Sequence, residues 1–145
     1  MADFVNKSRP VYGGLKIVAG ARRQIFALEG EGALALTEQA SKLSAADLGN
    51  AQIFYVARGT ADFAASLQGI DTGGFWRAPT VATLLARLRG VLGTATMGTR
   101  LYVAGTEGFI GQVLQLAMEL GVDPNSVLTE HRGSHVRRVQ CVHCK

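Results

Sequence analysis

Short apolar runs and amphipathic helical patterns alternate along most of the chain, and the clearest example lies at residues 100–133. Residues 101–104 form an apolar run and residues 105–108 a glycine-rich turn. Apolar side chains then recur at three-to-four spacing, at Phe109, Val113, Leu116, Ala117 and Leu120. This spacing is typical of a helix that packs one face on a core. Gly121 ends the predicted helix, and a short strand is predicted at residues 127–129.

The same alternation begins at Arg23. Apolar runs predict further strands at residues 24–28, 51–57 and 73–77. Helices are predicted between them, at residues 33–43, from Thr60 as the N-cap to about Leu67, and from Pro79 onward. The buried stripe of the last of these is expected to be Val81, Leu84, Leu85, Leu88 and Leu92. Five strands and four helices thus account for residues 23–130.

Strands that alternate with amphipathic helices imply right-handed crossovers in a parallel sheet. The pattern therefore predicts an α/β domain at residues 23–131, with a Rossmann-like, doubly wound, five-stranded parallel sheet. Residues 1–22 do not fit the sheet, because Pro10 and the glycine pair at 13–14 interrupt any regular pattern. They are expected to form an extended arm, or an arm that docks on a partner subunit. Residues 132–145 form a basic tail.

Composition supports one soluble domain, since 48% of the 145 residues are hydrophobic and 18% are charged. The net charge of +4 resides in the tail. Four of the 15 Lys and Arg residues follow Glu130, where there is no acid, and the other 11 balance the 11 Asp and Glu residues. No aromatic residues are interleaved with the basic ones, which argues against nucleic acid as a partner. No signal peptide or membrane span is evident, so we expect no membrane partner and a cytoplasmic protein.

Two glycine turns are candidate nucleotide-binding elements. Gly30 and Gly32 follow the first predicted strand, where backbone N–H groups could approach a pyrophosphate. Glu29 and Glu31 bring two carboxylates to the same turn, and this argues against a dianionic ligand. A glycine turn with acids at a helix N-terminus is the structural alternative.

The second candidate turn, Gly105 and Thr106, follows another strand at the edge where doubly wound sheets bind ligands. Arg58 follows the second strand, where such domains often contact the ribose of a cofactor or its phosphate. A solvated loop arginine is equally compatible with that position.

Little in the sequence indicates catalysis, because His131, His135 and His143 all lie near the end with no acid beyond Glu130. The sharpest local motif is the pair Cys141 and Cys144, whose CxxC spacing can supply two corners of a tetrahedral zinc site. Two ligands do not complete such a site. The motif is therefore interpreted as half of a zinc ribbon, with a redox dithiol or two unremarkable thiols as alternatives.

Two resemblances follow from these segments. The unit at residues 101–110, with residues 121–124 and 129–131, resembles the closing segment of the NAD(P)-binding domain of ferredoxin reductase-like proteins. That family has a Cys-Gly-Pro turn where this chain has Ala104, Gly105 and Thr106. The combination of several segments is similar to the DmmA-like small subunit of bacterial dimethylamine monooxygenase: residues 8–14, 29–36, 97–102, 129–134 and 137–144. Members of that family continue with a second cysteine pair, which would complete a zinc ribbon.

The second resemblance implies a multisubunit, haem-dependent monooxygenase that demethylates dimethylamine to methylamine and formaldehyde with NADPH and O2. Haem, FMN and iron–sulfur clusters are then expected on partner subunits, because this chain lacks the cysteine set for a cluster and an evident haem-ligand arrangement. The prediction is an accessory, assembly-stabilising subunit in a hetero-oligomer. The alternatives are an NAD(P)-binding reductase subunit that passes electrons to the oxygenase, and a free-standing zinc-ribbon module.

Overall fold

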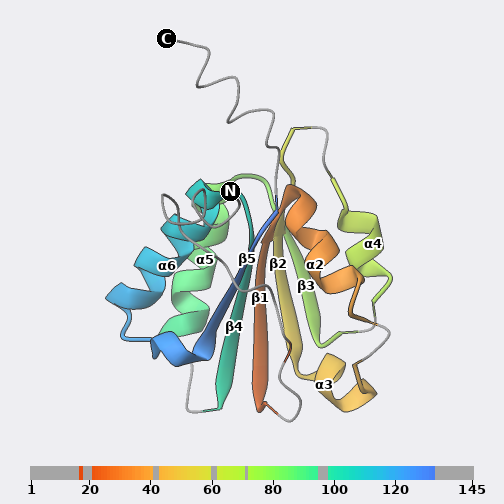
Figure 1. The fold of residues 1–145 in the computed structure, drawn as a ribbon, viewed down its shortest axis with the longest axis horizontal. Helices are drawn as coiled ribbons and strands as arrows, with labels where there is room; N and C mark the ends of the chain where they lie inside the picture. The colour runs from red at the N-terminus through yellow and green to blue at the C-terminus, as the bar shows by residue number, and fades with distance from the viewer. Residues whose placement is uncertain are drawn as a thin grey trace, which may run out of the picture.

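A five-stranded, fully parallel sheet forms the centre of the molecule (Figure 1). The computed structural model describes residues 17, 21–40, 43–59, 62–70, 72–94 and 98–132. The strand order is β3-β2-β1-β4-β5, and every neighbouring pair is parallel. The strands are β1 (Arg23–Glu29), β2 (Ala51–Val56), β3 (Gly74–Ala78), β4 (Thr99–Gly105) and β5 (Val127–His131). The predicted doubly wound sheet is confirmed, and each predicted strand lies within about two residues of the observed one.

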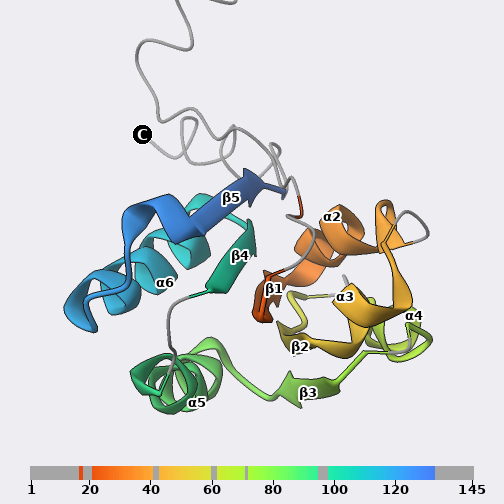
Figure 2. The same ribbon diagram turned by 90° about the horizontal axis from the view of Figure 1, so that it is seen from below.

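Helices cover both faces of the sheet (Figure 2). One face carries three short helices, α2 (Ala33–Thr37), α3 (Ala45–Gly49) and α4 (Ala64–Gln68). The other carries two longer ones, α5 (Val81–Gly93) and α6 (Glu107–Glu119). Short 3-10 turns, η1 (Gly30–Gly32) and η3 (Pro124–Ser126), follow β1 and precede β5. This two-sided arrangement buries the central strands on both faces, which explains their continuous apolar sequences.

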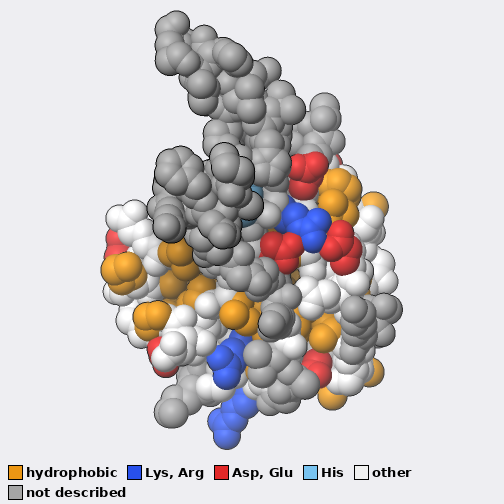
Figure 3. Space-filling model, viewed as in Figure 1, with side chains coloured by type: hydrophobic (Ala, Val, Ile, Leu, Met, Phe, Trp, Pro, Cys, Tyr) orange, Lys and Arg blue, Asp and Glu red, His pale blue; other side chains and the backbone are white. Residues whose placement is uncertain are grey.

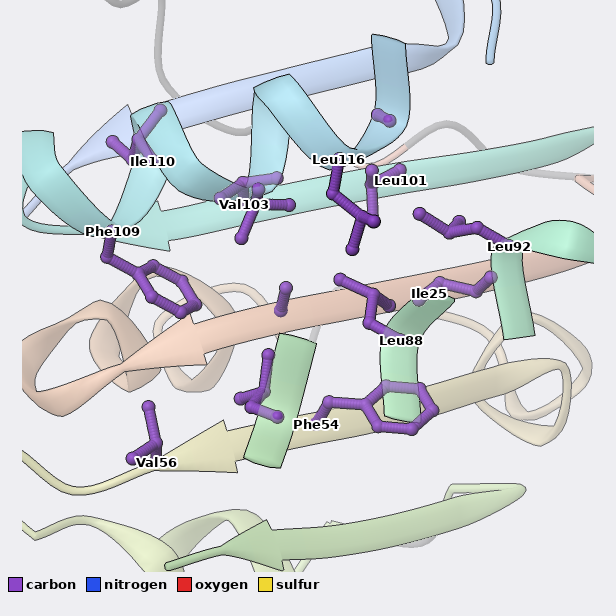
Figure 4. Close-up of a cluster of buried hydrophobic side chains, with 14 of the residues drawn as sticks. Ile25, Phe54, Val56, Leu88, Leu92, Leu101, Val103, Phe109, Ile110 and Leu116 are labelled. Atoms are coloured by element: carbon purple, nitrogen blue, oxygen red, sulfur yellow. The ribbon is translucent and has the colours of Figure 1, made fainter. Parts of the chain in front are cut away.

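The core consists of two layers, one on each side of the sheet. The layer beneath α5 and α6 joins the strands to apolar stripes of both helices (Figure 4). Leu84, Leu88 and Leu92 of α5 are buried there, as are Phe109, Val113 and Leu116 of α6. Val81, Leu85 and Leu120 are partly buried against the same layer. The helical periodicity in the sequence thus predicted the packing faces of α5 and α6.

The first helical segment differs from its prediction, because α2 ends at Thr37 and a separate helix, α3, begins after Ser44. The Ser44 side chain accepts a hydrogen bond from the backbone N–H of Asp47 and so caps α3. Leu43 packs against the second core layer without being helical. The apolar spacing at positions 36, 40 and 43 therefore predicted the side of the chain that faces the core, but it overestimated the length of the helix.

The prediction of Thr60 as a helix N-cap is also wrong, since α4 begins at Ala64 with Phe63 at the N-cap position. Phe63 caps without a side-chain hydrogen bond. The capping preference of threonine did not determine where α4 begins. Phe63 and Ala64, at the observed start of the helix, pack against the second core layer.

The connections that follow β1 and β4 run toward opposite edges of the sheet. The chain leaves β1 toward β2 on one side, and it leaves β4 toward β5 on the other. In open parallel sheets, ligands bind at this point, outside the carboxyl ends of the two strands. Here the ends of β1 and β4 carry η1 and the N-terminus of α6, the two turns predicted from glycine spacing.

Candidate functional site

The structure brings four of the five residues predicted for a nucleotide site to one place. Gly30 and Gly32 form η1 directly after β1. Gly105 ends β4, and Thr106 is the N-cap residue of α6. We call this place the switch point, defined by Glu29, Gly30, Gly32, Gly105 and Thr106.

A carboxylate of the protein itself fills the centre of the switch point. Glu29, the last residue of β1, is only 7% exposed. Its Oε1 accepts one hydrogen bond from the backbone N–H of Thr106 at 3.1 Å and another from the Thr106 hydroxyl at 2.7 Å. The Thr106 hydroxyl in turn accepts a bond from the Phe109 N–H at 3.4 Å. The N-terminus of α6, which would attract an anionic ligand, therefore has an anionic ligand from within the chain.

Protein atoms also explain the glycines of the switch point. A Cβ at Gly32 would lie 2.2 Å from the carbonyl oxygen of Ala104, so η1 touches the backbone of β4. A Cβ at Gly105, whose φ is 155°, would lie 2.9 Å from Cβ of Glu29. At both positions, glycine permits close contact between the ends of β1 and β4, and no ligand is needed to explain it.

A buried tyrosine, which the sequence did not single out, fixes η1 from the neighbouring strand. The Tyr55 hydroxyl donates to the Gly30 carbonyl at 3.1 Å and accepts from the Phe63 N–H at 2.9 Å. Burial, the largest cause, raises the pKa of Tyr55 above its ordinary value. The available signal was a hydroxyl within β2, where Gln52 is the one other polar side chain.

A second link joins the two sides of the switch point. The N–H of Arg132 donates to the Gly105 carbonyl at 2.8 Å, so the chain after β5 remains paired with the end of β4. The Arg132 guanidinium then reaches Glu38, just beyond α2, with contacts of 2.6 and 3.2 Å, and it also pairs with Glu130. We call these three residues the Arg132 bridge. It joins the β4–β5 side of the switch point to the β1–α2 side.

The Arg132 bridge is partly exposed, with side-chain exposures of 29% for Arg132, 55% for Glu38 and 18% for Glu130. Figure 3 shows one face of the molecule, on which acidic side chains gather around a basic one. Hydrogen bonding to Arg132 is the main cause that lowers the pKa of Glu38 below its ordinary value. The same contacts, with Glu38 first, raise the pKa of Arg132. The sequence did not reveal this bridge, because residues 38 and 132 are far apart in the chain.

The fifth predicted residue, Arg58, is not joined to this group. It lies two residues beyond the end of β2, where Val56 is the register partner of Glu29, and it is partly buried. The other predicted site residues, Cys141 and Cys144, lie outside the described residues, as do the arm before Ile17 and the tail beyond Arg132. In the described part of the chain, no group of three or more His, Cys, Asp or Glu residues could hold a metal ion. Nor is any helix there long and apolar enough to cross a bilayer.

The residues present do not fit a bound pyrophosphate at the switch point. The Thr106 donors at the N-terminus of α6 already bind Glu29, and Glu31 adds an exposed carboxylate on η1. A dianion at this position would displace a buried hydrogen-bonded carboxylate or lie close to it. Ala104, which is fully buried, stands where reductases of the resembled family have a cysteine.

Comparisons with known proteins agree with the fold. A model of the family described as "Dimethylamine monooxygenase subunit DmmA-like, N-terminal domain" matches residues 5–127. A search of curated proteins found no significant match.

Several solved structures share the fold. Phthalate dioxygenase reductase has a TM-score of 0.63 and 16% identity, over 84% of this chain and 40% of that one. An intact type IV self-sufficient cytochrome P450 monooxygenase has a TM-score of 0.61 and 19% identity, over 82% of this chain and 15% of that one. The FAD/NAD-binding domain of nitric oxide dioxygenase from Vibrio cholerae O1 biovar El Tor has a TM-score of 0.54 and 16% identity, over 84% of this chain and 56% of that one. The chain thus has the fold of a ferredoxin reductase-like domain and spans less than two thirds of each of these structures.

Proposed function

The chain belongs to the family of DmmA-like dimethylamine monooxygenase subunits, and from this membership we propose that it is an accessory, assembly-stabilising subunit of such an oxygenase. The enzyme would be a multisubunit, haem-dependent complex that demethylates dimethylamine with NADPH and O2. Haem, FMN and iron–sulfur clusters would belong to partner subunits. The role of this chain would be structural, with its reductase-like domain serving as a folded platform in the complex.

The pairing of Glu29 with Thr106 is the observation that carries this proposal. A nucleotide-binding subunit needs free hydrogen-bond donors at the switch point, and here a buried carboxylate occupies two of them. The Arg132 bridge adds a second link across the same place. Both features would stabilise the domain in the absence of a bound cofactor.

The proposal extends to the tail. Cys141 and Cys144 would form half of a zinc ribbon, completed by ligands outside residues 1–145 or from a partner subunit. Zinc analysis of the purified protein with its partner subunits, compared with a Cys141→Ser variant, tests this part. Loss of zinc in the variant is expected, and equal zinc content in both would contradict it.

Calorimetric titration of the purified chain with NADPH tests the main proposal. We expect no saturable heat at cofactor concentrations up to about 1 mM, the upper end of typical KM values. Saturable binding at micromolar NADPH would contradict it. The Trp76 fluorescence gives an independent readout in the same titration.

The competing candidate is an NAD(P)-binding reductase subunit that passes electrons to the oxygenase. The doubly wound fold and the Gly30–Gly32 turn favour it, because both occur in domains that bind nucleotides. This candidate requires Glu29 to leave the N-terminus of α6 when a cofactor binds. It therefore predicts that NADPH binds more tightly to a Glu29→Ala variant than to the wild type.

A further inference from the structure

The amino ends of β1 and β4, at the edge of the sheet opposite the switch point, carry arginines that have no acidic partner. Within the described residues, the ion pairs of the protein use Arg77, Arg89 and Arg132. None of them uses Arg22, just before β1, or Arg100, in β4. Figure 3 shows basic side chains close together at this end of the molecule. This edge of the sheet therefore keeps a positive charge that no described acid pairs with.

The two arginines lie beside the same end of the β1–β4 pair. The N–H of Arg22 donates to the Gly98 carbonyl at 3.0 Å. The Arg22 side chain lies against Gly98, where an added Cβ would be 3.1 Å from Cγ of Arg22. Arg100 is the register partner of Gln24, and its guanidinium donates to the Asn125 carbonyl at 3.1 Å. A guanidinium has further N–H donors, which remain for another acceptor.

Next to Arg100, β1 carries a buried amide without a hydrogen-bond partner. Gln24 is 1% exposed, and neither its Oε1 nor its Nε2 is paired with any described group. Side chains alternate along a strand, so Gln24 shares a face with Phe26, and Arg100 shares a face with Tyr102. The rings of Phe26 and Tyr102 stack at 4.7 Å, which places all four side chains on one face of the sheet. Buried polar groups are nearly always paired, so this amide indicates a missing partner.

The chemistry of these three side chains selects a small anion with several oxygen atoms. Two guanidinium groups attract an anion and repel a cation, and the Gln24 amide adds a neutral N–H donor. An apolar ligand would leave the amide unpaired, and a water molecule would leave both charges without a counter-ion. A partner protein surface does not reach a side chain that is 1% exposed. A small ion can enter beside Arg100, which is partly exposed.

We propose that Arg22, Gln24 and Arg100 bind a phosphate-type oxyanion, either as the free ion or as the end group of a small ester. The bound ion joins β1 to β4 at their amino ends, whereas Glu29 joins them to α6 at their carboxyl ends. The two places are at opposite edges of the sheet. Anion binding here therefore needs no change at the switch point, and it does not depend on the role of the chain in an oxygenase.

Calorimetric titration of the whole chain at constant ionic strength, with inorganic phosphate and with glycerol phosphate, tests this inference. At least one of the two shows saturable binding at a single site, and the tighter ligand identifies the free ion or the ester as the source. Gln24→Leu and Arg100→Met each weaken binding by about tenfold or more, the change expected for loss of a hydrogen bond to a charged group.

Arg87→Met is the matched control for the loss of one positive charge. Arg87 also has no acidic partner among the described residues, but it lies over the Trp76 ring, away from the amino ends of β1 and β4. This variant binds phosphate like the wild type. The proposal is overturned if neither ligand binds saturably, if Gln24→Leu leaves binding intact, or if Arg87→Met weakens it as much as Arg100→Met. The last result would indicate general attraction to a basic protein.

The stability of Gln24→Leu separates a ligand site from a structural amide. In phosphate-free buffer, the variant is at least as stable to urea as the wild type, because an apolar group of similar size replaces an unpaired amide. Phosphate then raises the urea midpoint of the wild type more than that of the variant, since only the wild type gains from specific binding. A variant that is less stable without phosphate, and gains as much from it as the wild type, contradicts the proposal.

Discussion

The Glu29 side chain does within this chain what a bound anion does at the N-terminus of a helix. It satisfies the Thr106 N–H and hydroxyl, and Thr106 in turn caps α6. Charge-assisted hydrogen bonds of this kind contribute more than neutral ones. In the sequence, Glu29 argued against a phosphate site. In the structure, its carboxylate binds the N-terminus of α6.

Replacing Glu29 by alanine leaves two buried donors of Thr106 without their acceptor. Such unsatisfied groups cost about 1–3 kcal/mol, so Glu29→Ala is expected to lower the free energy of unfolding by that amount in urea titrations. The matched control is Glu31→Ala, which removes an exposed acid two residues away. Equal stabilities of the two variants would contradict a structural role for Glu29.

Tyr55 gives a prediction of pH dependence. Burial raises its pKa above 10.0, so folding favours the neutral phenol. The stability that this provides is complete below pH 10 and declines as the pH rises through the folded-state pKa. Tyr55→Phe removes this decline while keeping Tyr12 and Tyr102.

The Tyr55→Phe variant also loses the hydrogen bonds to Gly30 and Phe63, so it is less stable at neutral pH by about 1–3 kcal/mol. Urea unfolding at about pH 8 and pH 11, on either side of the tyrosine pKa range, measures both effects. The stability difference between wild type and variant should shrink at the higher pH. A difference that grows with pH would contradict the assignment.

At the scale of elements, the sequence predicted what burial periodicity determines and missed what capping and long-range hydrogen bonds determine. The stripes of α5 and α6 were correct because each helix buries one continuous face, and the apolar strands were correct because the central strands are buried on both faces. The break between α2 and α3 was missed, since Leu43 keeps the spacing of a buried residue outside any helix. The Arg132 bridge and the Tyr55 contacts join residues distant in sequence, and no spacing rule reports such pairs.

The contact of η1 with β4 is the element-scale feature most sensitive to substitution. Gly32→Ala places a methyl group 2.2 Å from the Ala104 carbonyl oxygen, so one of the two backbones must move. Overpacking of this kind costs about 1–3 kcal/mol or more. Gly49→Ala, where a Cβ meets nothing within 4 Å, is the control and should be neutral or slightly stabilising. Chemical denaturation of both variants checks this, and a stable Gly32→Ala variant would contradict the close contact.

At the scale of the molecule, a reductase-like parallel sheet has a hydrogen-bonded carboxylate of its own, Glu29, at the place where doubly wound domains bind ligands. The parallel sheet, its strand order and the site between β1 and β4 match what doubly wound domains use to bind nucleotides. In the sequence, glycine spacing predicted the two turns at this edge of the sheet. The acids at positions 29 and 31 indicated that the first turn is unusual for a phosphate-binding turn. That Glu29 turns inward to Thr106 required the tertiary structure, because 77 residues separate the two.

The reduction of partner-bound flavin by NADPH, followed by stopped flow in the reconstituted monooxygenase, tests the central claim most directly. The account predicts the same reduction rate whether or not this chain is present, together with poorer assembly and slower dimethylamine demethylation when the chain is omitted. Flavin that stays oxidised until this chain is added would contradict the account, because the chain would then carry electrons from NADPH.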